Sequence, residues 1–335
     1  MQHILLLVGT MVGAGFASGK EIATIFLSSH SYAILGLLLS NILTGIIIYK
    51  VIQLVQENHI QNYQQLLLSI TPQKYTFLGM IFNSIINLFL LASFYIMIAG
   101  FATYIAQKAA LPLFIGIAMA LIITYLACRG NIQSLTNMNK LLMPLLILVV
   151  IHIWLQSVDN SIVENLFLQL SEGNVIDSCV KAVLYSSYNS IVLIPIIIEI
   201  AKHAKQKGKT IAIGTSAILF VLSYCITTLL YQPATPSLLA KDLLLLEVVQ
   251  IVQPNCTTIY GIMIAIAMIT SAIAAIYGYL QNITKTQTQY NRWLGILCIT
   301  AIPIAYIGFS NLINTLYPVF GIIGCVQIVL LFRKK

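Results

Sequence analysis

Long apolar segments separated by short polar connectors run through the 335 residues of this chain. Asp, Glu, Lys and Arg are absent from residues 75–107, 210–240, 248–284 and 293–332. The core of a bilayer is about 30 Å thick and takes about 20 apolar helical residues to cross, so stretches of this length indicate membrane spans. The pattern predicts spans at residues 3–27, 32–56, 75–107, 112–128, 138–156, 176–202, 210–231, 255–282, 293–309 and 315–332. We therefore predict an all-α polytopic membrane protein with ten transmembrane helices.

The composition supports a membrane protein. Hydrophobic residues make up 59% of the chain and charged residues 8%, whereas an average soluble domain has about 25% charged residues. A soluble enzyme, a disordered chain and a disulfide-built secreted module are therefore not expected. The net charge of +8 does not indicate a nucleic-acid partner, because the basic residues lie between apolar segments. The sequence has no G-x-x-x-x-G-K-[ST], H-E-x-x-H or G-x-S-x-G, so we expect neither ATP-driven transport nor an enzyme.

The distribution of Lys and Arg predicts the orientation in the membrane, because short cytoplasmic loops carry an excess of both. With the N-terminus inside, 13 of the 17 basic residues fall on the cytoplasmic side. They are Lys50, Lys74, Arg129, Lys140, Lys202, Lys205, Lys207, Lys209, Lys285, Arg292, Arg333, Lys334 and Lys335. We therefore expect an integral protein of the plasma or inner membrane with both termini cytoplasmic. Two connectors, residues 62–70 and 237–252, look amphipathic and are expected to lie at the membrane interface.

The first predicted span contains a cluster of glycines at Gly9, Gly13, Gly15 and Gly19. Each weakens a helix by about 1 kcal/mol, which favours local unwinding. Unwound backbone in a membrane is tolerated only where it faces protein or a water-filled cavity, and it can then bind ions or polar groups. The alternative is close helix packing, because two glycines four residues apart also form a helix-contact motif. The clustering, and the charged residues that follow it, favour unwinding.

A polar segment, Tyr185-Ser-Ser-Tyr-Asn-Ser190, interrupts the sixth predicted span, and Pro195 follows about one turn later. Polar side chains that compete for backbone groups, together with a proline, favour a second helix break. The first and sixth spans hold equivalent places in two five-span halves, residues 1–156 and 176–335, joined by an extracellular connector at 157–175. Interruptions at corresponding positions of two halves indicate the central binding site of a transporter.

The residues at these breaks are candidates for binding a solute. Glycine-rich backbone on one side and polar side chains on the other suit a carboxylate with a modest side chain. The candidates on the sixth span are Tyr185, Ser186, Ser187, Tyr188 and Asn189. On the third span, Asn83 and Asn87 are four residues apart and share a helix face. That face would either line the cavity, placing Asn87 at the solute, or form hydrogen bonds to neighbouring helices.

The sequence Gly13-Ala-Gly-Phe16 in a first span, together with an interrupted sixth span, resembles the amino acid–polyamine–organocation (APC) superfamily. The longer string GAGFASGKEI, residues 13–22, resembles the YkvI-type membrane proteins. This resemblance implies the five-plus-five inverted repeat of the LeuT-type fold, with helices 1 and 6 broken at mid-membrane. It also implies that backbone N–H groups near Gly13, Ala14 and Gly15, beside Phe16, bind a substrate carboxylate.

The resemblance further implies a site for a coupling cation, which would be Na+. Its ligands would be carbonyl groups near Gly9 and Val12 and the hydroxyls of Thr270 and Ser271 in the eighth span. Considered from the residues alone, a Thr-Ser pair within a helix has a simpler explanation, which is hydrogen bonding to carbonyls of its own preceding turn. No other metal site and no cofactor are expected.

Lys20 and Glu21 lie about one turn beyond the glycine cluster. Ionisable groups inside a span are costly and usually functional, so one interpretation is a proton-coupling or outer-gate pair. Successive helical residues point about 100° apart, so each needs a different partner, and Asp177 and Lys181 at the start of the sixth span are candidates. The other interpretation is that both side chains reach the outer interface by snorkelling.

These features predict a secondary active transporter of a small amino acid or related zwitterionic or organic solute. The solute would bind at the membrane midplane between spans one, three, six and eight, and transport by alternating access would be coupled to Na+ or H+. The alternative is a ligand sensor or receptor subunit that keeps the transporter fold without moving solute. The sequence indicates the solute and the lipid bilayer as partners and does not predict an oligomeric state.

Overall fold

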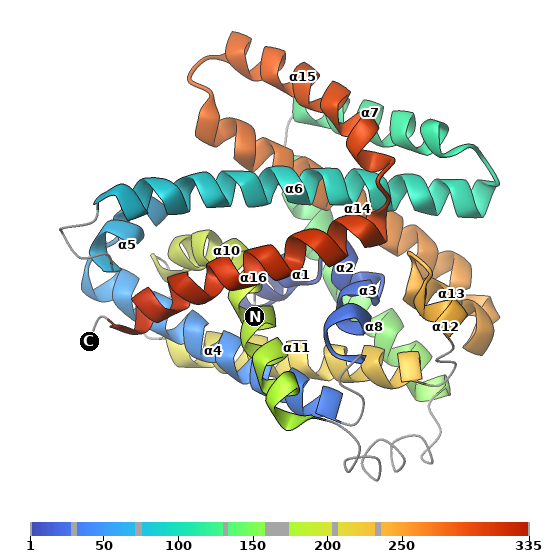
Figure 1. Ribbon diagram of the computed structural model, residues 1–335, viewed down its shortest axis with the longest axis horizontal. Helices are drawn as coiled ribbons and strands as arrows, with labels where there is room; N and C mark the ends of the chain where they lie inside the picture. Colours follow the sequence, from blue (N-terminus) through green and yellow to red (C-terminus); the bar gives the residue numbers. More distant parts are fainter. Residues whose placement is uncertain are drawn as a thin grey trace.

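The computed structural model describes residues 2–27, 32–70, 76–129, 133–157, 174–202, 207–231 and 236–333, and all regular structure in these ranges is helical (Figure 1). The helices are α1 (Gln2–Met11), α2 (Ala14–Ala17), α3 (Lys20–Ile25), α4 (Ala33–Glu57), α5 (Tyr63–Ile70), α6 (Thr76–Ala109), α7 (Leu113–Arg129), α8 (Gln133–Ser157), α10 (Val175–Ala201), α11 (Gly208–Tyr231), α12 (Pro236–Leu239), α13 (Leu244–Val252), α14 (Thr257–Ile283), α15 (Gln287–Ala305) and α16 (Phe309–Arg333). The predicted all-α class is confirmed.

The long helices agree with a protein that crosses a membrane several times. Six segments within the described ranges are long and apolar enough to span a bilayer; they are Ala33–Glu57, Asn83–Ala109, Val175–Ala201, Gly208–Tyr231, Pro254–Ile283 and Phe309–Arg333. Each of the other predicted spans also coincides with a helix or a group of helices. The connector predicted to separate the two halves falls mainly on residues 158–173, which lie outside the described residues.

The first predicted span is interrupted twice, as the glycine cluster indicates. α1 ends at Met11, and the N–H of Gly13 donates to the Met11 carbonyl at 2.8 Å instead of continuing the helix. After the single turn of α2, Gly19 adopts φ 73°, a left-handed conformation that glycine takes at little cost, and α3 follows. The predicted break in helix 1 is therefore confirmed.

The predicted break in helix 6 is wrong, because α10 is a continuous helix through the polar segment and Pro195. The polar side chains hydrogen-bond to carbonyls of the same helix and leave the backbone ladder in place. Ser186 Oγ donates to the Ala182 carbonyl at 3.0 Å, and Asn189 Nδ2 donates to the Tyr185 carbonyl at 2.9 Å. Side chains of this kind can either interrupt a helix or bond to carbonyls within an intact helix, and here they bond within an intact helix.

α10 lies at the centre of the molecule, in contact with α1, α4 and α16. α6 runs between this group and a peripheral pair formed by α7 and α15, as Figure 1 shows with α7 and α15 on the upper side of α6. α14 packs along α6, and the short α2 turn packs against α14. The broken first helix is thus surrounded by α8, α10, α11, α14 and α16.

The contact between α10 and α16 depends on small residues. A Cβ atom added to Gly324 would lie 2.2 Å from the Ser187 carbonyl oxygen, and one added to Gly321 would lie 3.3 Å from the Leu184 carbonyl oxygen. The two backbones therefore approach closely, as in other membrane helix pairs with small interface residues. This packing fixes where α16 lies relative to the tyrosines of α10.

We predict that Gly324→Ala destabilises the protein, because the added methyl group would overlap a backbone carbonyl that cannot move alone. Overpacking of this kind costs about 1–3 kcal/mol or more, and thermal unfolding of the detergent-purified protein measures it. Gly295→Ala in α15 is the matched control, because its Cβ would meet nothing within 4 Å. Equal melting temperatures for the two variants would contradict this account of the α10–α16 contact.

Candidate functional site

The glycine at position 15 allows two polar side chains to approach the backbone of the broken helix. A Cβ atom on Gly15 would lie 2.7 Å from Glu21 Oε2 and 2.9 Å from the Tyr317 hydroxyl oxygen. Glu21 belongs to the first turn of α3, and Tyr317 lies in the middle of α16. The chain reversal between α2 and α3 therefore folds the Glu21 carboxylate back onto the turn that precedes it.

Two tyrosines of α10 continue this site. The rings of Tyr188 and Tyr317 are stacked, with centroids 4.8 Å apart, and Tyr185 meets Tyr188 edge-on at 5.4 Å. Phe26, which follows α3, packs edge-on against Tyr185 at 5.2 Å. We call Tyr185, Tyr188 and Tyr317 the tyrosine cluster; all three residues are buried. The cluster connects α10 and α16 to the Glu21 carboxylate.

Several polar atoms of this site have no hydrogen-bond partner within the described part of the chain. They are Glu21 Oε1 and the hydroxyl oxygens of Tyr185 and Tyr188. Glu21 is only 4% exposed, and Tyr185 and Asn189 are its polar neighbours. Buried polar groups in folded proteins nearly always have partners, so a group of unpartnered ones calls for a specific explanation. A bound solute that completes their hydrogen bonds would be such an explanation.

Lys20 points away from Glu21, into the connector between α11 and α14. Its ammonium group donates to the carbonyls of Leu239 at 2.9 Å and Lys241 at 3.1 Å, and the side chain is 5% exposed. The interpretation that Lys20 and Glu21 snorkel to water is therefore wrong, because both side chains are buried. The side chains of Lys20 and Glu21 point in different directions, as expected for successive residues of a helix.

The same connector is fixed to the broken helix by two further contacts. The N–H of Leu245, in α13, donates to the Ser18 carbonyl at 2.7 Å, and this carbonyl belongs to the second break. The Asp242 carboxylate accepts from the N–H of Ser310 at 3.0 Å, at the start of α16. Residues 239–245 thus cover the second break and link it to α16.

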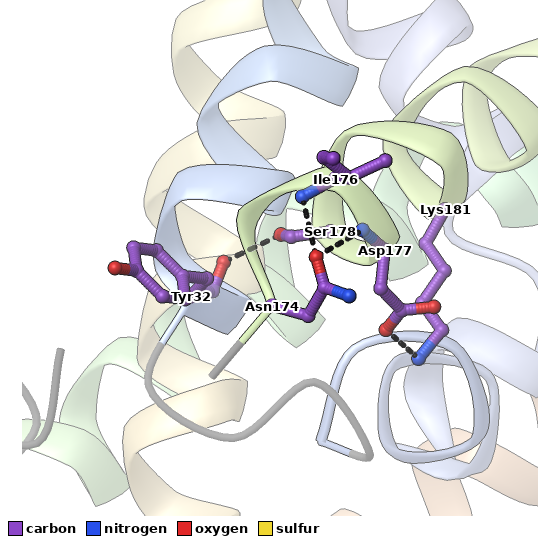
Figure 2. Close-up of polar contacts among 6 residues, drawn as sticks. All are labelled: Tyr32, Asn174, Ile176, Asp177, Ser178 and Lys181. Atoms are coloured by element: carbon purple, nitrogen blue, oxygen red, sulfur yellow. Dashed lines mark hydrogen bonds and ion pairs between the residues drawn. The ribbon is translucent and has the colours of Figure 1, made fainter. Parts of the chain in front are cut away.

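Lys181 lies at the start of α10, where its ammonium group pairs with Asp177 one turn earlier at 2.5 Å (Figure 2). Figure 2 also shows the cap of this helix, in which Asn174 Oδ1 accepts from the N–H groups of Ile176 and Asp177. Asp177 and Lys181 were candidate partners for the Lys20–Glu21 pair; the structure pairs them with each other.

Of the other residues predicted to bind the solute, some lie at the site and others form contacts around it. Gly13 faces Met97 of α6, and Phe16, three residues after Gly13, is fully buried; of Ala14 only the backbone is described. Ser186 hydrogen-bonds within α10, and Ser187 contacts the Cys325 sulfur of α16 at 3.2 Å. The two serines therefore serve the helix and the α10–α16 interface.

The Asn87 side chain forms a hydrogen bond between α6 and α14. Its side-chain oxygen accepts a hydrogen bond from Asn282 at 3.0 Å, near the C-terminal end of α14. Of the two interpretations of the Asn83–Asn87 face, this contact corresponds to hydrogen bonding with a neighbouring helix. Asn282 lies twelve residues after Thr270 in α14. The contact is therefore near the end of this helix, whereas Thr270 is near its middle.

The residues of the expected cation site lie in α1, directly after α1 and in α14. The Thr270 hydroxyl donates to the carbonyls of Ile266 at 2.9 Å and Ala267 at 3.2 Å, which is the simpler explanation for its place in a helix. A Cβ on Gly9 would meet Met143 of α8 at 2.8 Å, and Val12 is buried, while Ser271 is half-buried. The site itself stays a prediction.

Two aromatic residues of this region were not singled out in the sequence. Tyr317 lies in a charge-free span far from the glycine cluster along the chain, and its position before Pro318 gives no functional signal. Tyr260 of α14 donates its hydroxyl to the Ala17 carbonyl and so satisfies backbone released by the second break. The contacts of Tyr317 with Gly15 and of Tyr260 with Ala17 join residues more than 200 positions apart, which periodicity cannot reveal.

We predict that Lys20→Met destabilises the protein, because two carbonyls of the connector would lose a charged donor. Hydrogen bonds of this kind contribute about 1.5–3 kcal/mol. A lower melting temperature and faster proteolysis within residues 236–252 would be observed. Lys181→Met is the control, since a partly exposed pair one turn apart contributes only about 0.3–0.5 kcal/mol. A larger loss of stability in the control would refute the role of Lys20.

Comparison with known proteins agrees with these observations, although no family model matches the chain. The chain is 25% identical over 339 residues to the uncharacterized membrane protein YkvI of Bacillus subtilis, covering 100% of this chain and 95% of that protein. It is 24% identical to the uncharacterized protein YyaD of the same bacterium, covering 99% of this chain and 95% of the relative. The resemblance to YkvI-type membrane proteins thus extends over the full length.

Among solved structures, the fold is similar to that of a manganese transporter from Eremococcus coleocola. Two mutants of that transporter each match with a TM-score of 0.57 and 14% sequence identity, over 98% of this chain and 77% of the transporter. At this identity the likeness concerns the fold. The chain is a multi-pass membrane protein that is similar to the YkvI-type proteins and has the fold of a known transporter.

Proposed function

We propose that this protein is a secondary active transporter of a small amino acid or a related zwitterionic or organic solute. The observation that carries the proposal is the site at the broken first helix, where Gly15 and Glu21 meet Tyr185 and Tyr317 in a transporter fold. Backbone interrupted inside a membrane is retained where it faces a cavity or other protein, and in transporters it faces the solute. The unpartnered oxygens at this site support the same assignment.

Alternating access gives the contacts around the second break a role. In the proposed orientation, with both termini cytoplasmic, residues 239–245 lie on the outer side and their hydrogen bonds to Ser18 and Lys20 close the site from that direction. Opening to the outside would require these bonds to exchange for bonds to water. The proposed arrangement as two inverted five-helix halves would let the same site open to the opposite side.

We propose an organic solute in preference to a divalent metal ion. The structural neighbours are manganese transporters, which makes a metal the natural competing cargo. The donors assembled at the break are one carboxylate, phenol hydroxyls and an amide, and manganese favours several carboxylate, carbonyl and water oxygens together. Within the described residues, no group of three His, Cys, Asp or Glu side chains could hold a metal.

Uptake into proteoliposomes tests the proposal with a matched pair of glycine variants. The added methyl group of Gly15→Ala would displace the Glu21 carboxylate and the Tyr317 hydroxyl, both ends of side chains that can shift without unfolding the protein. The Cβ of Gly13→Ala would make only an ordinary contact, 3.8 Å from Met97. We expect uptake of amino acids to fall about tenfold or more in Gly15→Ala, the scale of an ångström-sized displacement, and to persist in Gly13→Ala.

Two results would contradict the assignment. Uptake that is unchanged in Gly15→Ala would show that the solute binds elsewhere. Solute binding by the wild-type protein without any flux, under sodium and proton gradients of either direction, would instead identify a sensor that keeps the transporter fold.

Coupling to Na+ or H+ is tested by the predicted cation site on α14. If Na+ binds there, Thr270→Ala combined with Ser271→Ala removes the sodium dependence of uptake, because two hydroxyl ligands are lost. The double variant is expected to fold, since the Thr270 hydroxyl bonds only to its own helix in the structure. Sodium dependence that survives both substitutions would rule out this site, and uptake driven by a pH gradient alone would indicate H+.

A further inference from the structure

We infer that the solute carries a protonated amine, and that Glu21 and the tyrosine cluster of α10 and α16 hold this ammonium group. This inference rests on the proposed function and specifies the chemistry of the solute at the same site. It depends on three features of the site: a buried carboxylate outside the ion pairs of the described residues, oxygen atoms without a hydrogen-bond partner beside it, and a series of buried aromatic rings.

The first feature is that the Glu21 carboxylate forms no ion pair with a cation of the described residues. The ion pairs among the described residues join Asp177 to Lys181 and Glu199 to Lys202. Lys20, the neighbour of Glu21, has its ammonium group bound to the carbonyls of the 236–252 connector. A carboxylate buried to this degree carries either a proton or a cationic partner, because an unpaired ion is very costly inside a protein. Because the ion pairs of the described residues do not include Glu21, a cationic partner would come from a ligand.

The second feature is the number and kind of acceptors that lack a donor. Glu21 Oε1, the Tyr185 hydroxyl and the Tyr188 hydroxyl are buried without a hydrogen-bond partner in the described residues. A primary ammonium group has three N–H donors and no acceptor. It can therefore complete these three groups together with its charge placed next to the carboxylate. A hydroxyl group would offer a single donor, and a quaternary ammonium group would offer none.

The third feature is the aromatic surroundings. Phe26, Tyr185, Tyr188 and Tyr317 form a continuous series of rings, with neighbouring centroids 4.8–5.4 Å apart. A cation within about 6 Å of such a ring is attracted by its electron-rich face, most strongly where water is excluded. All four residues are buried, so the rings provide an environment that excludes water. A buried series of aromatic rings suits an ammonium group better than a strongly hydrated metal ion.

The experiment is a thermal-shift titration of the full-length protein in lipid nanodiscs at constant sodium concentration. The probes are the common amino acids, the 2-hydroxy acids that correspond to them, the primary amines that lack the carboxylate, and manganese chloride. We expect stabilisation by a subset of the compounds that carry an ammonium group, and loss of that stabilisation when the amine is replaced by a hydroxyl. No stabilisation by any ammonium compound, or equal stabilisation by the hydroxy acids or by manganese, would overturn the inference.

The decisive variant is Glu21→Gln, which keeps the shape of the side chain and removes its charge from a buried position. Removing one partner of a buried ion pair typically weakens affinity on the order of a hundredfold or more. Glu199→Gln is the matched control, since Glu199 is an exposed carboxylate near the end of α10 that pairs with its neighbour Lys202. Full affinity for the amine in Glu21→Gln would refute the assignment.

A second test uses the tyrosines and leaves Glu21 in place. Tyr185→Phe combined with Tyr188→Phe keeps the rings and removes two acceptors, so affinity for a primary amine should fall more than affinity for its N-trimethyl counterpart. Tyr306→Phe, at a residue that is 54% exposed, is the control. Equal losses for the two amines would contradict the assignment of the hydroxyls.

Gly15→Ala separates this inference from the proposed function. If Gly15→Ala abolishes binding while Glu21→Gln preserves it, the solute site is correct and recognition of the amine by Glu21 is refuted. If neither substitution changes binding, both the inference and the location of the solute site are wrong.

Discussion

The need to satisfy backbone hydrogen bonds inside a membrane governs the arrangement around the first helix. Each interruption releases N–H and C=O groups that cannot turn to lipid, so other parts of the protein must bind them. The structure meets this need with contacts from distant segments: Tyr260 bonds to the Ala17 carbonyl, and Leu245 bonds to the Ser18 carbonyl. The positions of α13 and α14 beside the break follow from these contacts.

The same breaks separate two charged neighbours into different roles. Because α3 begins at a left-handed glycine, Lys20 enters the 236–252 connector and Glu21 turns back toward Gly15. The lysine has carbonyl partners on the protein, whereas Oε1 of the glutamate has none among the described residues. One residue of the pair therefore holds the connector in place, and the other remains open to a ligand.

How well the sequence predicted each break depends on the physics of the residues involved. Glycine weakens a helix in any environment, so the cluster in the first span predicted a break that the structure contains. Serine and asparagine act differently in different environments, because their side chains can also bond to the helix that carries them. In α10 the polar side chains bond to carbonyls of their own helix and the helix stays intact. The sequence alone does not show which of the two behaviours occurs.

The candidate site could be predicted in part for a related reason. Gly15, Glu21, Tyr185 and Tyr188 are unusual for their own spans, so the local sequence identifies them. Tyr317 is unremarkable locally and gains its role from a stacking contact across the molecule, which the close approach of Gly324 to Ser187 makes possible. With α10 unbroken and packed this tightly on α16, the deformable backbone lies in the first helix. In the proposed transporter, the motion that admits a solute would involve these two interruptions, next to the carboxylate that we assign to the solute's amine.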